Sequence, residues 1–166
     1  MATSKTTKSR RAAARKSGAP QDAVALLKAD HKEVEGWFDD YEDLTSNAEK
    51  SALAGKICAA LKVHTQIEEE IFYPAARQAT TDDDLIDEAV VEHAGAKDLI
   101  AQIEGMKAGD DLYDAKVKVL GEQIKHHVKE EEEELFPEAH RANMDLVELG
   151  ARMAARKSEL KAQLGV

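Results

Sequence analysis

The sequence predicts an all-α protein: an up-down-up-down antiparallel four-helix bundle with a basic N-terminal arm and an extra C-terminal helix. Three observations predict this fold. Apolar residues make up 43% of the chain but aromatic residues only 4%, and the abundant Ala, Leu, Glu and Lys lose little rotamer freedom in a helix. Only three prolines interrupt 166 residues, so long helices are allowed. A two-helix unit also occurs twice.

The repeated unit is marked by a motif in its second helix. The motif has the form His-x-x-x-Glu-Glu followed by an aromatic residue and Pro, and its copies lie 63 residues apart, at His64, Glu68, Glu69 and Pro74 and at His127, Glu131, Glu132 and Pro137. An acid-His pair precedes each copy, at Asp30-His31 and Glu92-His93. Such duplication predicts two helical pairs that pack together.

Length and composition predict one domain of ordinary size. We divide the chain into an arm (1–20), the bundle (21–142) and a C-terminal amphipathic helix (143–166) that packs on the bundle or pairs with a second subunit as a homodimer. The single cysteine, Cys58, has no internal partner, and no secretory signal is evident, so we expect a cytoplasmic protein. No run approaches the roughly 18 apolar residues of a membrane span.

Charge is distributed unevenly. The chain carries a net charge of −10, yet residues 1–21 hold six basic residues before the first acid, which leaves 17 basic and 33 acidic residues beyond them. The acidic body should repel nucleic acid, so any such contact is expected to be weak and to involve the arm 1–20. Because it has no large apolar side chain after Met1, the arm is predicted to be disordered. A solubilising tail, a polyanion contact, a sorting address and a transit peptide are all open.

The first two helices are predicted over 22–44 and 47–78. Asp22 is a good N-cap, and apolar residues recur at helical spacing through Val24, Leu27, His31, Val34, Phe38 and Tyr41. The second helix has the stripe Leu53, Ile57, Ala60, His64, Ile67/Glu68 and Ile71, and Pro74 should kink or end it. Each stripe therefore carries a histidine at a core position.

The third helix is predicted to open at Thr81, and the fourth to run from just after Gly109-Asp110 to about Glu138. Their stripes are Ile86, Val90, His93, Ala96/Lys97, Ile100 and Ile103, then Tyr113, Val117, Leu120, Ile124, His127, Glu131 and Glu134/Leu135. His126 lies about 100° from His127 and should face solvent. Glu130 and Glu133 are expected in solvent as well. A last helix is predicted over about 144–163.

Short links force the four helices to run antiparallel, and the histidines then lie at closely similar heights. Residues four apart share a helix face, so Glu68 joins His64 and Glu131 joins His127 in one layer. Burying two facing carboxylates is costly unless a cation neutralises them, although a hydrogen-bonded network without metal remains an alternative. Four His and two Glu exceed one structural zinc site, and they suit two ions, each with two imidazoles and both Glu bridging. Iron or manganese fits such ligands, and the spacing leaves zinc and copper open.

The order single His, His-x-x-x-Glu-Glu…Phe-x-Pro, single His, His-x-x-x-Glu-Glu…Phe-Pro resembles the hemerythrin-like, HHE cation-binding family over about residues 22–140. The resemblance implies a four-helix bundle with a non-haem di-iron centre, bridged by carboxylates and an oxo or hydroxo group, with zinc or manganese as alternative metals. It implies binding, sensing or reduction of O2, peroxide or nitric oxide, in oxidative or nitrosative stress or iron handling. The positions that match the family's ligands are His31, His64, Glu68, His93, His127 and Glu131.

Two departures from the family pattern bear on function. Oxygen-carrying hemerythrins have a second His where this chain has Lys97, and an Asp where it has Glu132. One iron would then lack a ligand or recruit Glu35, Glu132 or water. Lys97 either reaches inward, as a proton donor that favours a catalase-like consumption of peroxide over reversible oxygen carriage, or extends out of the bundle as a surface residue, with water in the vacant position. The rival interpretation is a metal-dependent binding or regulatory module without turnover.

Overall fold

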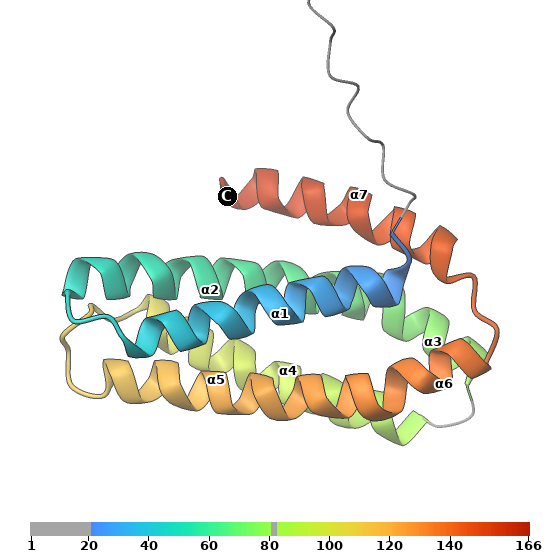
Figure 1. The fold of residues 1–166 in the computed structure, drawn as a ribbon, viewed down its shortest axis with the longest axis horizontal. Helices are drawn as coiled ribbons and strands as arrows, with labels where there is room; N and C mark the ends of the chain where they lie inside the picture. Colours follow the sequence, from blue (N-terminus) through green and yellow to red (C-terminus); the bar gives the residue numbers. More distant parts are fainter. Residues whose placement is uncertain (1–20, 81–82) are drawn as a thin grey trace, which may run out of the picture.

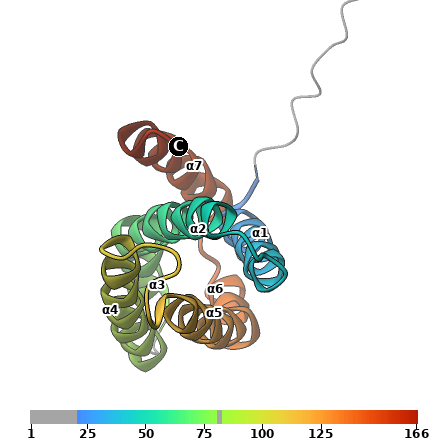
Figure 2. The same ribbon diagram turned by 90° about the vertical axis from the view of Figure 1, so that its left-hand side faces the viewer.

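Four long helices form an antiparallel bundle. The computed structural model describes residues 21–80 and 83–166, so the predicted arm 1–20 and the predicted helix start at Thr81 lie outside the described residues. The helices that lie side by side along the long axis are α1 (Ala23–Glu42), α2 (Asn47–Ile67), α4 (Asp83–Glu104) and α5 (Tyr113–Glu130) (Figure 1). Seen from one end, they occupy the four corners of the bundle (Figure 2). The predicted all-α fold is confirmed.

Helix starts follow the capping chemistry that the sequence indicates. The Asp22 side chain accepts a hydrogen bond from the Ala25 N–H at 2.8 Å, which satisfies one of the free N–H groups at the start of α1. Ser46 has the same role for α2. α5 instead begins after Leu112, a residue in the left-handed region with φ of 70°.

Helices α2 and α5 do not stop at the prolines. Each continues into a short π-helical turn, η1 (Glu68–Phe72) and η2 (Glu131–Leu135), and then into α3 (Tyr73–Ala79) and α6 (Phe136–Arg141). Of the two outcomes expected at Pro74, a kink or an end, the structure does not show an end, because the helix runs on to Ala79, close to the predicted limit at residue 78. A π turn is wider than an α turn, so the proline ring can follow it without meeting the carbonyl four residues earlier.

The apolar core is divided into two parts. One part surrounds Phe72 and Phe136 near α3, α6 and α7, and the other surrounds Ile100 and Leu120 towards the opposite end of the bundle. The four histidines lie between them. The predicted stripes largely coincide with buried positions, but Val90 is 40% exposed and Ala89 takes its place in the core.

The last helix, α7 (Leu146–Leu164), packs against α1 and α2 on the outside of the bundle (Figure 2). Its buried residues are Leu146, Leu149, Gly150, Met153 and Leu160. A Cβ added to Gly150 would lie 2.3 Å from the carbonyl oxygen of Gln21, so α7 can approach the start of α1 only because this residue has no side chain. A homodimer through this helix stays a prediction.

The structure also bears on two sequence expectations, one about membrane-spanning helices and one about the single cysteine. Within residues 21–80 and 83–166, no helix is long and apolar enough to cross a membrane. Cys58 is a buried free thiol, and burial raises its pKa to about 11. It is therefore packed as a small apolar side chain.

Candidate metal centre

All six predicted ligands lie in one buried layer across the middle of the bundle. The residues come from α1, α2, η1, α4, α5 and η2, and none exposes more than 6% of its surface: His31, His64, Glu68, His93, His127 and Glu131. His126, by contrast, has a 64% exposed side chain, so the prediction that His127 is the inward member of the pair is confirmed. We call these six residues the central cluster.

The central cluster consists of two histidine pairs. The Nε2 atoms of His31 and His64 are 3.2 Å apart, and those of His93 and His127 are 3.1 Å apart. Two nitrogens at this distance cannot both carry a proton towards each other, so each pair presents at least one lone pair to its neighbour.

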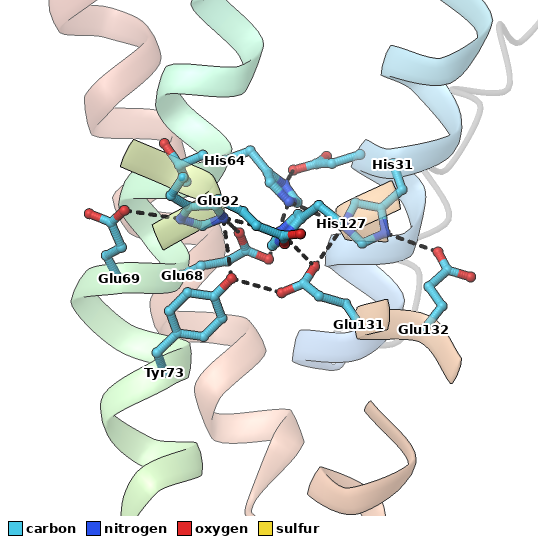
Figure 3. Close-up of polar contacts among 12 residues, drawn as sticks. His31, His64, Glu68, Glu69, Tyr73, Glu92, His127, Glu131 and Glu132 are labelled. Carbon is cyan, nitrogen blue, oxygen red and sulfur yellow. Dashed lines mark hydrogen bonds and ion pairs between the residues drawn. The ribbon is translucent and has the colours of Figure 1, made fainter. Parts of the chain in front are cut away.

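Each carboxylate of the central cluster contacts both histidine pairs. Glu68 places Oε1 3.2 Å from His64 Nε2 and Oε2 3.3 Å from His93 Nε2. Glu131 Oε2 lies 3.3 Å from His31 Nε2 and 3.5 Å from His127 Nε2 (Figure 3). The arrangement matches two ions with two imidazoles each and two bridging carboxylates, as the repeat predicts.

An outer ring of carboxylates holds the far side of every imidazole. The Nδ1 atom lies near a carboxylate oxygen in all four histidines, in the pairs His31–Glu132 (2.9 Å), His64–Asp30 (3.4 Å), His93–Glu69 (3.0 Å) and His127–Glu92 (2.7 Å). A proton on Nδ1 that is donated to a carboxylate leaves the Nε2 lone pair free for a metal. The ring therefore orients all four imidazoles with Nε2 towards the centre, where a cation that displaces any proton could bind.

Sequence reasoning did not identify this outer ring. Its signal was present in the repeat, since Asp30 and Glu92 directly precede a histidine, and Glu69 and Glu132 directly follow a carboxylate of the central cluster. The sequence predicts Glu132 and Glu35 only as replacement ligands. In the structure Glu132 contacts Nδ1 of His31, and Glu35 belongs to none of the groups of possible metal ligands found among the described residues.

Three carboxylate oxygens in the centre lack a hydrogen-bond donor. These are Glu68 Oε1, Glu68 Oε2 and Glu131 Oε2, and both side chains are at most 2% exposed. Buried carboxylate charge is strongly destabilising unless it is neutralised, so the cluster requires positive charge at its centre, from protonated imidazoles or from metal ions. The donor set of four imidazoles and two carboxylates fits first-row transition metals.

The electrostatics of the central cluster also favour a bound cation. Burial lowers the pKa of His64, but the charge of Glu68 and the hydrogen bond to Asp30 outweigh it and raise the pKa to about 10. Burial raises the pKa of Glu68, yet contacts with His64 and His93 hold it well below its usual range. The negative potential that draws a proton to the His64 imidazole would equally attract metal cations.

The two halves of the central cluster differ in one aromatic residue. The Tyr73 hydroxyl donates a 2.8 Å hydrogen bond to Glu131 Oε1 and lies 3.2 Å from His93 Nε2. The repeat has Phe136 at this position, and its ring stacks on His31 with centroids 5.8 Å apart. At this position of the repeat, the His93 side has a phenolic hydroxyl and the His31 side has none, a difference that the sequence analysis did not recognise.

Lys97 lies outside the central cluster. Its Nζ is 2.6 Å from both carboxylate oxygens of Glu69, and its side chain is 45% exposed. Glu69 in turn accepts the hydrogen bond from His93. Lys97 therefore contacts the cluster only through Glu69, not from the inward position that the proton-donor prediction requires.

A small cavity adjoins the histidines. It has a volume of about 10 Å³ and is lined by all four imidazoles together with apolar side chains that include Val34, Leu61 and Ile124. This is near the lower limit for one water molecule. Any molecule that reaches the imidazoles without moving the helices must be about that small.

Comparisons with known proteins agree with this architecture. Residues 22–139 match the family model described as Hemerythrin HHE cation binding domain. The crystal structure of a Hemerythrin HHE cation binding domain-containing protein from Mycobacterium kansasii has a TM-score of 0.74 and 27% identity, and the match covers 86% of this chain and 88% of that one.

A DNA nickase from Nostoc sp. is 26% identical over 143 residues, which is 84% of this chain but 40% of the nickase. The chain thus corresponds to less than half of that relative. Because the family model matches most of the described bundle, including all six residues of the central cluster, the chain belongs to the hemerythrin HHE cation-binding family.

Proposed function

We propose that this protein holds two iron ions in the central cluster and uses them to bind or reduce a small oxidant: O2, peroxide or nitric oxide. One observation carries the proposal. Two buried carboxylates with unpaired oxygens each face both histidine pairs. Bound iron would supply redox chemistry and open coordination positions. Zinc and manganese remain alternative occupants.

The residues around the central cluster would give this chemistry its selectivity. The outer carboxylates hold the imidazoles in orientation, which keeps the ligand set ready for the ions. The cavity of about 10 Å³ has room for about one water-sized molecule, which disfavours bulky substrates. Val34, Leu61 and Ile124 in its wall exclude bulk water, and Tyr73 holds Glu131 through its hydroxyl. These features favour a small neutral oxidant over a larger substrate.

The decisive experiment measures metal content and turnover together. Protein purified from iron-rich medium should contain about two irons per chain, and His64→Ala and Glu131→Ala should remove them. The exposed His126→Ala and His140→Ala variants should keep them. The iron form should consume peroxide by dismutation, in which two H2O2 give O2 and two H2O. Equal iron content in all four variants would refute the ligand assignment.

A second function is favoured by the contact between the central cluster and α7. Asp30, which contacts Nδ1 of His64, also forms an ion pair with Lys157 on α7. Arg156 on the same helix contacts Glu70 in η1 at 2.7 Å. Metal occupancy could therefore alter the docking of α7, as a metal-dependent binding module requires. In the nickase, the matched region is one part of a longer protein.

Hydrogen exchange distinguishes the module from the enzyme. A module predicts that chelation increases exchange in α7 without any peroxide consumption by the iron form. An enzyme predicts peroxide consumption and an α7 whose protection is independent of metal.

A further inference from the structure

The face of the bundle formed by α4 and α5 carries a second group of possible ligands. His126 Nε2 lies 3.1 Å from Glu130 Oε1 and 3.5 Å from Glu92 Oε1. These three residues, which we call the outer cluster, come from two helices. His126 and Glu130 are four residues apart, the spacing of His127 and Glu131 one position further along.

The repeat shows that the outer cluster is particular to one half of the molecule. The first copy has Val63 and Ile67 where the second has His126 and Glu130, and both are at most 2% exposed. Both belong to the apolar core that also includes Met153 and Leu160 of α7. At these two repeat positions the side covered by α7 is therefore apolar, whereas the other side carries His126 and Glu130.

The outer cluster has the dimensions of a cation site. Two donor atoms that are each about 2.1 Å from a tetrahedral ion lie about 3.4 Å apart, close to the two measured distances. One imidazole and two carboxylates suit a first-row divalent cation whose remaining positions are filled by water. A surface depression of about 440 Å³ opens over them, and neither Lys nor Arg lines it among the residues that the structure describes.

The outer cluster is directly connected to the central one. Glu92 contacts His126 through Oε1 and accepts the hydrogen bond of His127 through Oε2 at 2.7 Å. A cavity of about 10 Å³ lies beneath, lined by Glu92, Glu130, His127 and Glu131 among others. Glu131, whose Oε2 is buried and has no hydrogen-bond donor, thus adjoins the cavity on the side of the central cluster.

We propose that Glu92, His126 and Glu130 form an outer site for a first-row divalent cation, through which the central cluster is loaded. The proposal rests on the proposed function only in assuming that the central cluster takes metal. The cation binds first to the exposed imidazole and carboxylates and passes Glu92 and Glu130 to reach Glu131. Acidic residues around the depression raise the local concentration of cations.

Co²⁺ is a suitable probe, because its binding can be followed by elemental analysis and by visible absorption. The metal-free, full-length protein is dialysed against Co²⁺, and loading is followed by stopped flow. The test variants are His126→Ala and Glu130→Gln, and the control is His140→Ala, another exposed histidine. Glu92 is left unchanged because it also holds His127.

The wild-type protein and the control should bind three Co²⁺ ions at saturation, and each test variant two. Loading of the two remaining ions should slow by about tenfold, the low end of what electrostatic focusing contributes to association rates. The final occupancy of the central cluster should not change. Circular dichroism and melting temperature should match the wild type, since His126 is exposed.

Three outcomes would each refute a different part of the reasoning. Equal Co²⁺ content and equal loading rates in all proteins would refute the outer site. Loss of the third ion without slower loading would refute the role of the outer site in loading the central cluster. Fewer than two firmly bound ions in every protein would refute the proposed function, while a difference of one ion between wild type and His126→Ala would still establish the outer site.

Discussion

Replacing Glu131 with Gln keeps the size of the side chain but removes one of two buried negative charges. Glu131 Oε2 lies 3.3 Å from His31 Nε2 and 3.5 Å from His127 Nε2. Because one carboxylate serves both histidine pairs, the variant should lose affinity for both ions together rather than for one of them.

The size of the effect can be worked out from metal linkage. Changing a residue that merely supports a metal ligand commonly lowers metal affinity about 10–100-fold, so we take about 100-fold as the lower bound for Glu131. At a free metal concentration of about 100 times the wild-type Kd, each ion stabilises the wild-type protein by about 2.7 kcal/mol and the variant by about 0.4 kcal/mol. At about 2–4 °C per kcal/mol, each ion should raise the wild-type melting temperature by about 5–11 °C and that of the variant by about 1–2 °C.

The assay is thermal unfolding by circular dichroism, with saturating metal and with chelator. The matched control is Glu133→Gln, a residue of the same acidic run with a 65% exposed side chain, which should behave as the wild type does. Without metal, Glu131→Gln should melt close to the wild type, because the Gln oxygen can still accept the Tyr73 hydrogen bond. A variant that keeps the full metal-induced shift would refute the bridging role of Glu131.

Three further predictions follow from other parts of the structure. Gly150→Ala should destabilise the protein by about 1–3 kcal/mol, the usual cost of overpacking, because its Cβ would meet the backbone of residues 21–23. The control is Gly55→Ala, which has open space around it and should stabilise α2 by up to about 1 kcal/mol. Urea titration measures the free energy of unfolding of both variants. The pKa of His64 is raised from 6.5 to about 10, so its contribution is complete below pH 6.5, and the metal-free protein should lose stability as the pH rises from about 6.5 to 10. Constant stability across that range would contradict the pKa. Deleting residues 1–20 should leave iron content and helicity unchanged, because all six ligands lie beyond them. Salt-dependent retention on immobilised DNA tests whether this segment contacts phosphates.

The sequence was sufficient to predict the helices and the six residues of the central cluster, because both depend on periodicity. A histidine at a core position of each stripe must face the other stripes once the helices are antiparallel. Ala89 and Val90 lie three and four residues after Ile86, and either step fits a helical stripe. Periodicity alone therefore does not decide which of the two is buried.

What the sequence did not predict depends on contacts between helices. The outer carboxylates are partly exposed charges, and they resemble ordinary surface residues until their distances to the imidazoles are known. Each π turn begins at a carboxylate of the central cluster and ends just before the segment that contains Pro74 or Pro137, and no helix propensity of these residues indicates it. The ion pair of Lys157 with Asp30 joins residues 127 positions apart, and only the docking of α7 brings them together.

The position of Lys97 leads to the last prediction. Its ion pair with Glu69 is partly exposed, and pairs of this kind contribute at most about 1 kcal/mol. Lys97→Met should therefore keep two irons and change metal affinity by less than about fivefold, acting only through Glu69 and His93. Lys97→Arg preserves the charge and is the control. Metal affinity is measured by competition with a chelator, and peroxide consumption by oxygen evolution. A tenfold or larger loss of peroxide consumption in Lys97→Met, with iron content unchanged and Lys97→Arg active, would instead mean that the lysine reaches the central cluster and donates a proton there.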